Sequence, residues 1–192
     1  MIELIVISPE TTFPHETEWV HKMMAAGLKK YHVRKPFFSI EEQQHYLGLY
    51  DTSAQNQLVV HQHQEEALQS GFKHVHIKAQ ERQQKKLMGH WPSCSTSFHQ
   101  VEEVASEGTQ FAYAFLSPIF DSLSKPNYKA TSSLIDQVQD TLAEVYALGG
   151  VVPERIAALK GKGFTGVAAL GYVWQKNPLD QFLRLQEACH AL

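Results

Sequence analysis

Residues 111–117 read Phe-Ala-Tyr-Ala-Phe-Leu-Ser and residues 166–170 read Gly-Val-Ala-Ala-Leu, two short runs dominated by apolar side chains. Neither run alternates apolar with polar residues, which is typical of a parallel strand that is covered on both faces. The connections between such runs in this chain are long enough to hold a helix, and parallel neighbours require connections of that length. The two runs therefore predict a parallel sheet built from βα units.

The same pattern recurs along the whole chain and predicts eight strands. They are expected at Ile2–Ser8, Tyr31–Arg34, Leu58–His61, Val75–Ile77, Pro92–Ser95, Phe111–Leu116, Val145–Leu148 and Gly166–Leu170, of which Pro92–Ser95 has the weakest pattern. Helices are expected at Glu16–Ala26, after a capping Ser39, and at Glu65–Ser70, Val101–Ser106, Ser133–Thr141, Pro153–Lys160 and Leu179–His190. Eight units favour an α/β (βα)8 TIM barrel over an open doubly wound sheet, as a single compact domain over residues 1–192.

The composition limits the partners of the protein. The 192 residues include 17 Lys or Arg and 20 Asp or Glu, so the formal charge of −3 provides no basic field for a nucleic-acid backbone. No stretch approaches the roughly 18 apolar residues of a membrane-spanning helix, so we expect no membrane partner. Two cysteines and an N-terminus without a leader sequence indicate a cytoplasmic protein with reduced thiols. Apolar strips on the barrel helices would allow a homodimer.

Glycines follow the last two expected strands. In a βα barrel the site lies at the C-terminal ends of the strands, and the loops after strands seven and eight recurrently hold a phosphate. Gly149 and Gly150 follow the seventh strand and Gly171 follows the eighth. Glycine lets backbone N–H groups approach an anion closely, so these loops predict a phosphate site. The alternative is that the glycines only turn the chain.

Cations follow the second and sixth strands. Arg34 and Lys35 end the second strand, and the segment SPIFDSLSK, Ser117–Lys125, brings hydroxyl groups and an ammonium to the loop after the sixth. Loop lysines and serines are usually only solvated. Two cationic clusters and the glycines at one mouth nevertheless predict a phosphorylated small molecule as the substrate.

Histidines form two closely spaced pairs among the 11 in the chain. His61 and His63, like His74 and His76, stand two residues apart near strand ends, a spacing that puts both rings of a pair on one face of a strand. His61 and His63 are candidate metal ligands, although zinc would need a third ligand. The alternative is that one member of each pair packs or faces water.

The strand-end residues form a set that resembles one known family. The set comprises YHVRKP at Arg34, VHI at His76, STSFHQVEE at His99, SPIFDSLSK at Lys125, LGGV at Gly149 and Gly150, and TGVAALGYVW at Gly171. In this order, over essentially the whole chain, it is similar to the thiamine-phosphate synthase and TenI family. The SPIF…SK and LGGV pair is its most specific part. The resemblance implies a (βα)8 barrel that acts in thiamine biosynthesis.

The resemblance also implies a reaction and roles. The synthase joins hydroxymethylpyrimidine diphosphate to thiazole phosphate and releases diphosphate through a carbocation-like step aided by magnesium. Cations would contact the diphosphate, serine hydroxyls would assist them, and the glycines would hold the thiazole phosphate. The implied catalytic residues are Arg34, Lys125 and His99, and the implied substrate-binding residues are Lys35, His76, Ser122, Ser124, Gly149, Gly150 and Gly171.

The chain departs from the family pattern where magnesium would bind. The family carries Asn-Asp after strand three, where this chain has His61-Gln62, and Gly-Gln-x-Asp after strand four, where this chain has residues 78–81, Lys-Ala-Gln-Glu. Magnesium prefers oxygen ligands such as carboxylates, so we expect weak or absent Mg²⁺ binding by the free protein. The metal would then arrive with the substrate's diphosphate, unless Glu65 or Glu81 takes the missing role. A zinc or nickel ion on His61 and His63 is the rival expectation.

The TenI branch of the family supplies the alternative functions. Its members share the barrel and the thiazole phosphate site, need neither magnesium nor a diphosphate substrate, and some isomerise a thiazole tautomer. Pro118 stands in place of the histidine implied for that activity, so His61, His76 or His99 would have to move the proton. A non-catalytic thiazole-phosphate-binding relative is the third expectation. The retained cations of the diphosphate half-site favour the synthase.

Overall fold

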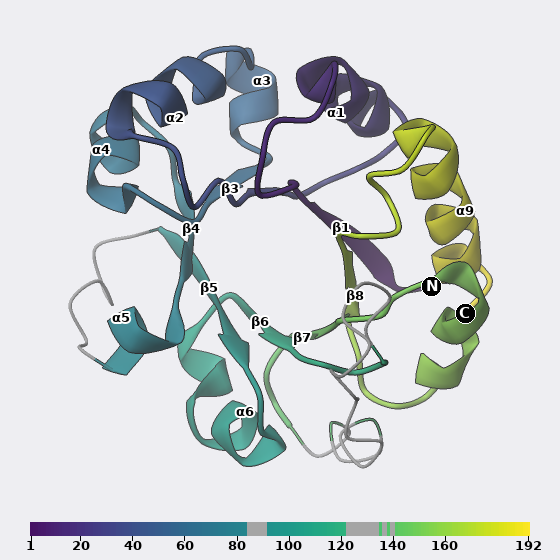
Figure 1. Ribbon diagram of the computed structural model, residues 1–192. Helices are drawn as coiled ribbons and strands as arrows, with labels where there is room; N and C mark the ends of the chain where they lie inside the picture. Colours follow the sequence, from purple (N-terminus) through teal and green to yellow (C-terminus); the bar gives the residue numbers. More distant parts are fainter. Residues whose placement is uncertain (84–91, 122–134, 136–137, 139–140) are drawn as a thin grey trace.

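The computed structural model describes residues 1–83, 92–121, 135, 138 and 141–192. Within them, parallel strands close into a barrel in the order β1 to β8, with helices around the outside (Figure 1). The strands are β1 (Glu3–Ile7), β2 (Tyr31–Val33), β3 (Leu58–Val60), β4 (His74–Ile77), β5 (Ser93–Phe98), β6 (Tyr113–Leu116), β7 (Val145–Leu148) and β8 (Gly166–Ala169). Because residues 3–6 of β1 pair with residues 166–169 of β8, the TIM barrel is confirmed and the open sheet is wrong.

Helices connect the strands and cover the barrel. They are α1 (Glu16–Ala25), α2 (Ile40–Leu47), α3 (Thr52–Gln55), α4 (Gln64–Gln69), α5 (Ala79–Gln83), α6 (Val101–Glu107), α8 (Pro153–Ile156) and α9 (Pro178–His190), with 3-10 turns η1 (Gly108–Gln110) and η3 (Ala157–Leu159). Ser39 caps α2 as expected: its hydroxyl accepts the Glu42 N–H, and the Glu42 carboxylate accepts the Ser39 N–H. The expected helix Ser133–Thr141 falls mostly outside the described residues. None of the described helices is long and apolar enough to cross a membrane.

The strands sort their side chains between two layers. Residues such as Tyr31 and Val33 of β2 point outward and join the large core beneath the helices. The interior beside β1, β6, β7 and β8 is filled by an apolar cluster of Ile5, Ile7, Tyr113, Phe115, Tyr146 and Ala168. The interior beside β2 to β5 is polar instead, with buried histidine and serine side chains. The buried histidines of the barrel interior therefore lie in the half beside β2 to β5.

Candidate functional site

A cavity of about 270 Å³ opens at the C-terminal ends of the strands. Its lining residues end or follow strands β1 to β7, which is where TIM barrels hold their sites. They are Ile7, Arg34, His61, His76, Lys78, Ala79, Ser97, His99, Phe115 and Leu148. Four residues singled out from the sequence are thus brought together: Arg34, His61, His76 and His99. Lys78 and Ser97 were not expected, although both stand at strand ends.

The cavity rim is cationic. The end of β2 is held by Ser8, whose hydroxyl oxygen accepts the Arg34 N–H at 2.8 Å. The half-exposed Arg34 guanidinium pairs with Glu10, and Lys78 is the second cation of the lining. None of the lining residues within the described ranges carries a carboxylate. A concave mouth lined by one sign of charge concentrates ions of the opposite sign, so this one favours an anionic ligand.

His99 ties two strand ends together. Its Nδ1 lies 2.7 Å from the carbonyl oxygen of Ser117, across from β5 to the end of β6. Because a carbonyl only accepts, Nδ1 carries the proton and Nε2 remains an acceptor. The ring is therefore held in one orientation at the exposed edge of the cavity.

Lys35 does not lie on the rim, which corrects the expectation from sequence. Its side chain is fully buried, and its ammonium donates to Glu16 Oε2 at 2.7 Å and to the Thr11 carbonyl at 2.9 Å. The Lys35 side chain therefore points into the core toward Glu16, whereas Arg34 lines the mouth. Burial lowers the pKa of Lys35, and the hydrogen bond and charge of Glu16 oppose that shift.

The glycines after β7 and β8 have different surroundings. Gly149 and Gly150 have φ of 96° and 62°, and a Cβ on Gly150 would lie 2.3 Å from the Asp121 carbonyl oxygen. These two glycines therefore turn the chain and admit the loop after β6. Gly171 has an ordinary φ, and no atom lies within 4 Å of where its Cβ would be. Gly171 is thus the glycine with open space for a ligand. The expected Ser122, Ser124 and Lys125 lie outside the described residues.

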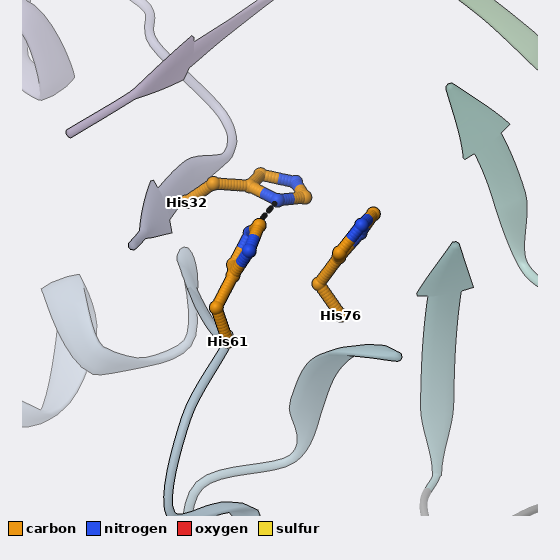
Figure 2. Close-up of side chains that lie close together, drawn as sticks. All are labelled: His32, His61 and His76. Carbon is orange, nitrogen blue, oxygen red and sulfur yellow. Dashed lines mark hydrogen bonds between the residues drawn. The ribbon is translucent and has the colours of Figure 1, made fainter. Parts of the chain in front are cut away.

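Three buried histidines converge beneath the cavity, from β2, the end of β3, and β4 (Figure 2). His32 Nδ1 lies 2.9 Å from His61 Nε2, and the rings of His61 and His76 stack with centroids 4.3 Å apart. Burial and neighbouring positive charge lower the pKa of all three, that of His76 to about 3. The rings are therefore neutral at pH 7.

The His61 and His63 pair expected from sequence does not form. His63 has a left-handed backbone, with φ of 48°, and its Nε2 lies 2.9 Å from the Phe38 carbonyl oxygen. The chain leaves β3 before His63, so the period of two no longer applies there. His32 was the residue missed in this cluster. Strand alternation could have identified it: Tyr31 and Val33 point toward the helices, so His32 between them must point into the barrel.

Magnesium does not fit the described residues of the mouth. The Gln62 side-chain oxygen accepts the Lys35 N–H at 3.1 Å and so is already used inside the fold. The Glu81 carboxylate accepts the Lys78 N–H at 2.9 Å at the start of α5, and Glu65 is exposed on α4. No carboxylate of the described residues is thus directed into the cavity, and Mg²⁺ lacks its preferred ligands there.

Comparison with known proteins connects this geometry to a family. The sequence pattern of the family described as thiamine monophosphate synthase matches residues 4–173. A thiamine-phosphate synthase from Caldivirga maquilingensis is 36% identical over 89 residues, a match that spans 44% of this chain and 43% of that relative.

Solved structures agree in fold. A thiamine phosphate pyrophosphorylase from Bacteroides thetaiotaomicron superposes with a TM-score of 0.82 at 23% identity, over 98% of both chains. One from Pyrococcus furiosus superposes with a TM-score of 0.80 at 15% identity, over 99% of this chain and 96% of the other. Since the family pattern covers most of the chain, the protein belongs to the thiamine monophosphate synthase family.

Proposed function

We propose that the chain catalyses the synthase reaction of its family, joining hydroxymethylpyrimidine diphosphate to thiazole phosphate. The observation that carries the proposal is the cationic mouth, where Arg34 and Lys78 line the cavity and no described lining residue is acidic. A protein that bound only thiazole phosphate would have no evident need for these cations beside the glycine loops. A diphosphate leaving group gives them a role.

The reaction assigns a task to each group. The bond between the pyrimidine methylene carbon and the diphosphate oxygen breaks, and the diphosphate leaves with the electron pair. The thiazole nitrogen then forms the new C–N bond to that carbon. Negative charge develops on the departing diphosphate, and the positive charges of Arg34 and Lys78 would offset it. Lys125, to which the family resemblance assigns contact with the diphosphate, would add a third cation, and Gly171 leaves room for the thiazole phosphate.

Thiazole tautomerisation has less support. That reaction needs a base and an acid with a pKa near the working pH. His61 and His76 line the cavity, but burial lowers the pKa of both, and His76 has a pKa of about 3. Imidazoles so shifted are weak bases near pH 7. His99 then remains as the exposed ring, with its Nδ1 proton committed to Ser117.

The test is an assay of the purified full chain with both substrates, with magnesium supplied for the diphosphate. Wild type should form thiamine phosphate, and Arg34→Gln should lower kcat by about 100- to 1000-fold, as removal of one donor to developing charge does. The fold should survive, because Arg34 pairs only at the surface. The matched control is Arg184→Gln on α9, an exposed arginine outside the cavity, which should keep full turnover.

Two results would contradict the proposal. One is the absence of thiamine phosphate from wild type with both substrates, whatever the protein does to the thiazole tautomer supplied alone. The other is full turnover by folded Arg34→Gln. Lys125→Ala provides an independent check, with a similar fall in rate and an unchanged melting temperature expected.

A further inference from the structure

The His32, His61 and His76 rings have the composition and spacing of a metal-ligand set. One nitrogen from each ring can be chosen so that all three lie within 4.8 Å of one another. Figure 2 shows the rings converging from three separate segments, with His32 and His61 already joined at 2.9 Å. In a tetrahedral zinc site with Zn–N bonds of about 2.0–2.1 Å, ligand nitrogens are about 3.3 Å apart. The His32–His61 distance is already below that spacing, and the widest separation in the set exceeds it by at most about 1.5 Å.

The contacts on the far sides of two rings orient the lone pairs inward. His32 Nε2 lies 2.7 Å from the Tyr113 hydroxyl oxygen, which can accept its proton and leave Nδ1 free to bind an ion. His76 Nδ1 lies 3.0 Å from Ser95 Oγ, whose own proton goes to the Val75 carbonyl. Ser95 therefore accepts from Nδ1, and His76 Nε2 keeps its lone pair. Metal-binding histidines depend on such outer hydrogen bonds.

His76 Nε2 has one competing partner. The Ser97 hydroxyl oxygen lies 3.0 Å from it, and its proton can point at the nitrogen. A bound ion would take the place of that proton, while the Ser97 hydroxyl rotates toward the cavity it lines. The ion would likewise lie between the His32 and His61 rings, and the His61 proton would move from Nε2 to Nδ1, which leaves Nε2 as the ligand.

The surroundings determine which ion fits. All three ligands are imidazoles, which suit borderline ions such as zinc and do not suit magnesium. The rings are buried and therefore neutral, as ligation requires. Arg34 and Lys78 oppose a bare dication, but His61 and His76 face the cavity, where a hydroxide or a phosphate oxygen can occupy the fourth position and offset the charge.

We propose that His32, His61 and His76 bind one zinc-class divalent ion inside the barrel, with its fourth position open to the cavity. This site differs from the His61 and His63 pair considered from sequence. Its three ligands are nitrogen atoms, whereas a magnesium site would need oxygen ligands. The proposal concerns ion binding and stands whether or not the chain proves to be a synthase.

The experiment titrates the metal-stripped full chain with Co²⁺, whose visible absorption reports tetrahedral coordination, and then adds Zn²⁺. We expect one Co²⁺ per chain, displaced by equimolar Zn²⁺ and retained in excess Mg²⁺. His32→Gln and His76→Gln should each abolish the tetrahedral absorption. Ser95→Ala should weaken binding by about 10- to 100-fold, as loss of an outer partner does.

The controls are two histidines outside the cluster. His74→Gln alters β4, the strand that carries His76, at the opposite end of the barrel interior. His63→Gln alters the histidine whose ring contacts the Phe38 carbonyl. Both variants should bind Co²⁺ like wild type. X-ray absorption of zinc-loaded wild type should show three imidazoles at about 2.0 Å, which keeps the test decisive if a variant misfolds. Absence of stoichiometric binding by wild type, fewer than three imidazoles, or unchanged binding by the folded His32 and His76 variants would overturn the site.

Discussion

Replacing Lys35 by methionine should destabilise the fold and leave substrate binding intact. The Lys35 ammonium lies 2.7 Å from Glu16 Oε2, with both side chains buried. The other carboxylate oxygen of Glu16 accepts the hydroxyls of Tyr31 at 2.8 Å and Tyr46 at 2.6 Å. Methionine occupies a similar volume, but it leaves the Glu16 carboxylate buried without a counter-charge.

The size of the effect follows from this burial. Removing one partner of a buried ion pair costs about 3–5 kcal/mol of unfolding free energy. For a domain of this size each kcal/mol shifts Tm by about 2–4 °C, so Tm should fall by about 6–20 °C. Lys29→Met is the matched control: Lys29 is 76% exposed and 3.7 Å from Glu3, and its loss should cost less than about 1 kcal/mol. Adding Glu16→Gln to Lys35→Met should restore part of the loss, because a neutral amide needs no counter-charge.

The assay is urea and thermal unfolding followed by circular dichroism, with calorimetric binding of thiazole phosphate and of inorganic diphosphate. The opposite outcome is that Lys35→Met unfolds at the same temperature and urea concentration as Lys29→Met and also loses affinity for the anions. That pair of results would place the Lys35 ammonium at the mouth, beside Arg34.

Three further predictions use other parts of the fold. Gly171→Val should keep wild-type stability, since its Cβ meets no atom within 4 Å, and should weaken thiazole phosphate binding in calorimetry; unchanged affinity would remove the phosphate from this loop. The Tyr146 hydroxyl donates to Glu3 at 2.6 Å and lowers the pKa of the Glu3 carboxyl. This hydrogen bond therefore stabilises the fold fully above the pKa that Glu3 has in the unfolded chain, and the stabilisation is lost as pH falls through the lower pKa of the folded chain. The gap in unfolding free energy between wild type and Tyr146→Phe should therefore narrow from pH 7 to about pH 3, and a constant gap would contradict the linkage. Burial raises the pKa of Cys94 to about 11 and that of Cys189 to about 12, so a maleimide at about pH 8 should label both thiols more slowly in the folded chain than after unfolding. Equal labelling rates in the two states would contradict these shifts.

The barrel could be predicted because its signal is local and repeated. Short apolar runs without alternation, spaced by helix-sized connections, leave few arrangements besides parallel strands covered by helices. Even the weak run at Pro92–Ser95 belongs to a strand, β5, which extends over Ser93–Phe98. Its pattern is weak because Ser95 faces the interior and pairs with His76 rather than with apolar neighbours.

The sequence by itself determined the barrel and one cavity-lining cation, Arg34, because both follow from short strands and from the residues directly after them. Only the tertiary structure decided the partners of the remaining polar groups. Lys35 is adjacent to Arg34 in the chain, yet its side chain is buried against Glu16 of α1. His32 and His76 are 44 positions apart in the chain, and closure of the barrel brings their ring centroids to 5.6 Å. Such contacts depend on how separate strands curve around one interior, and no local pattern of residues contains that information.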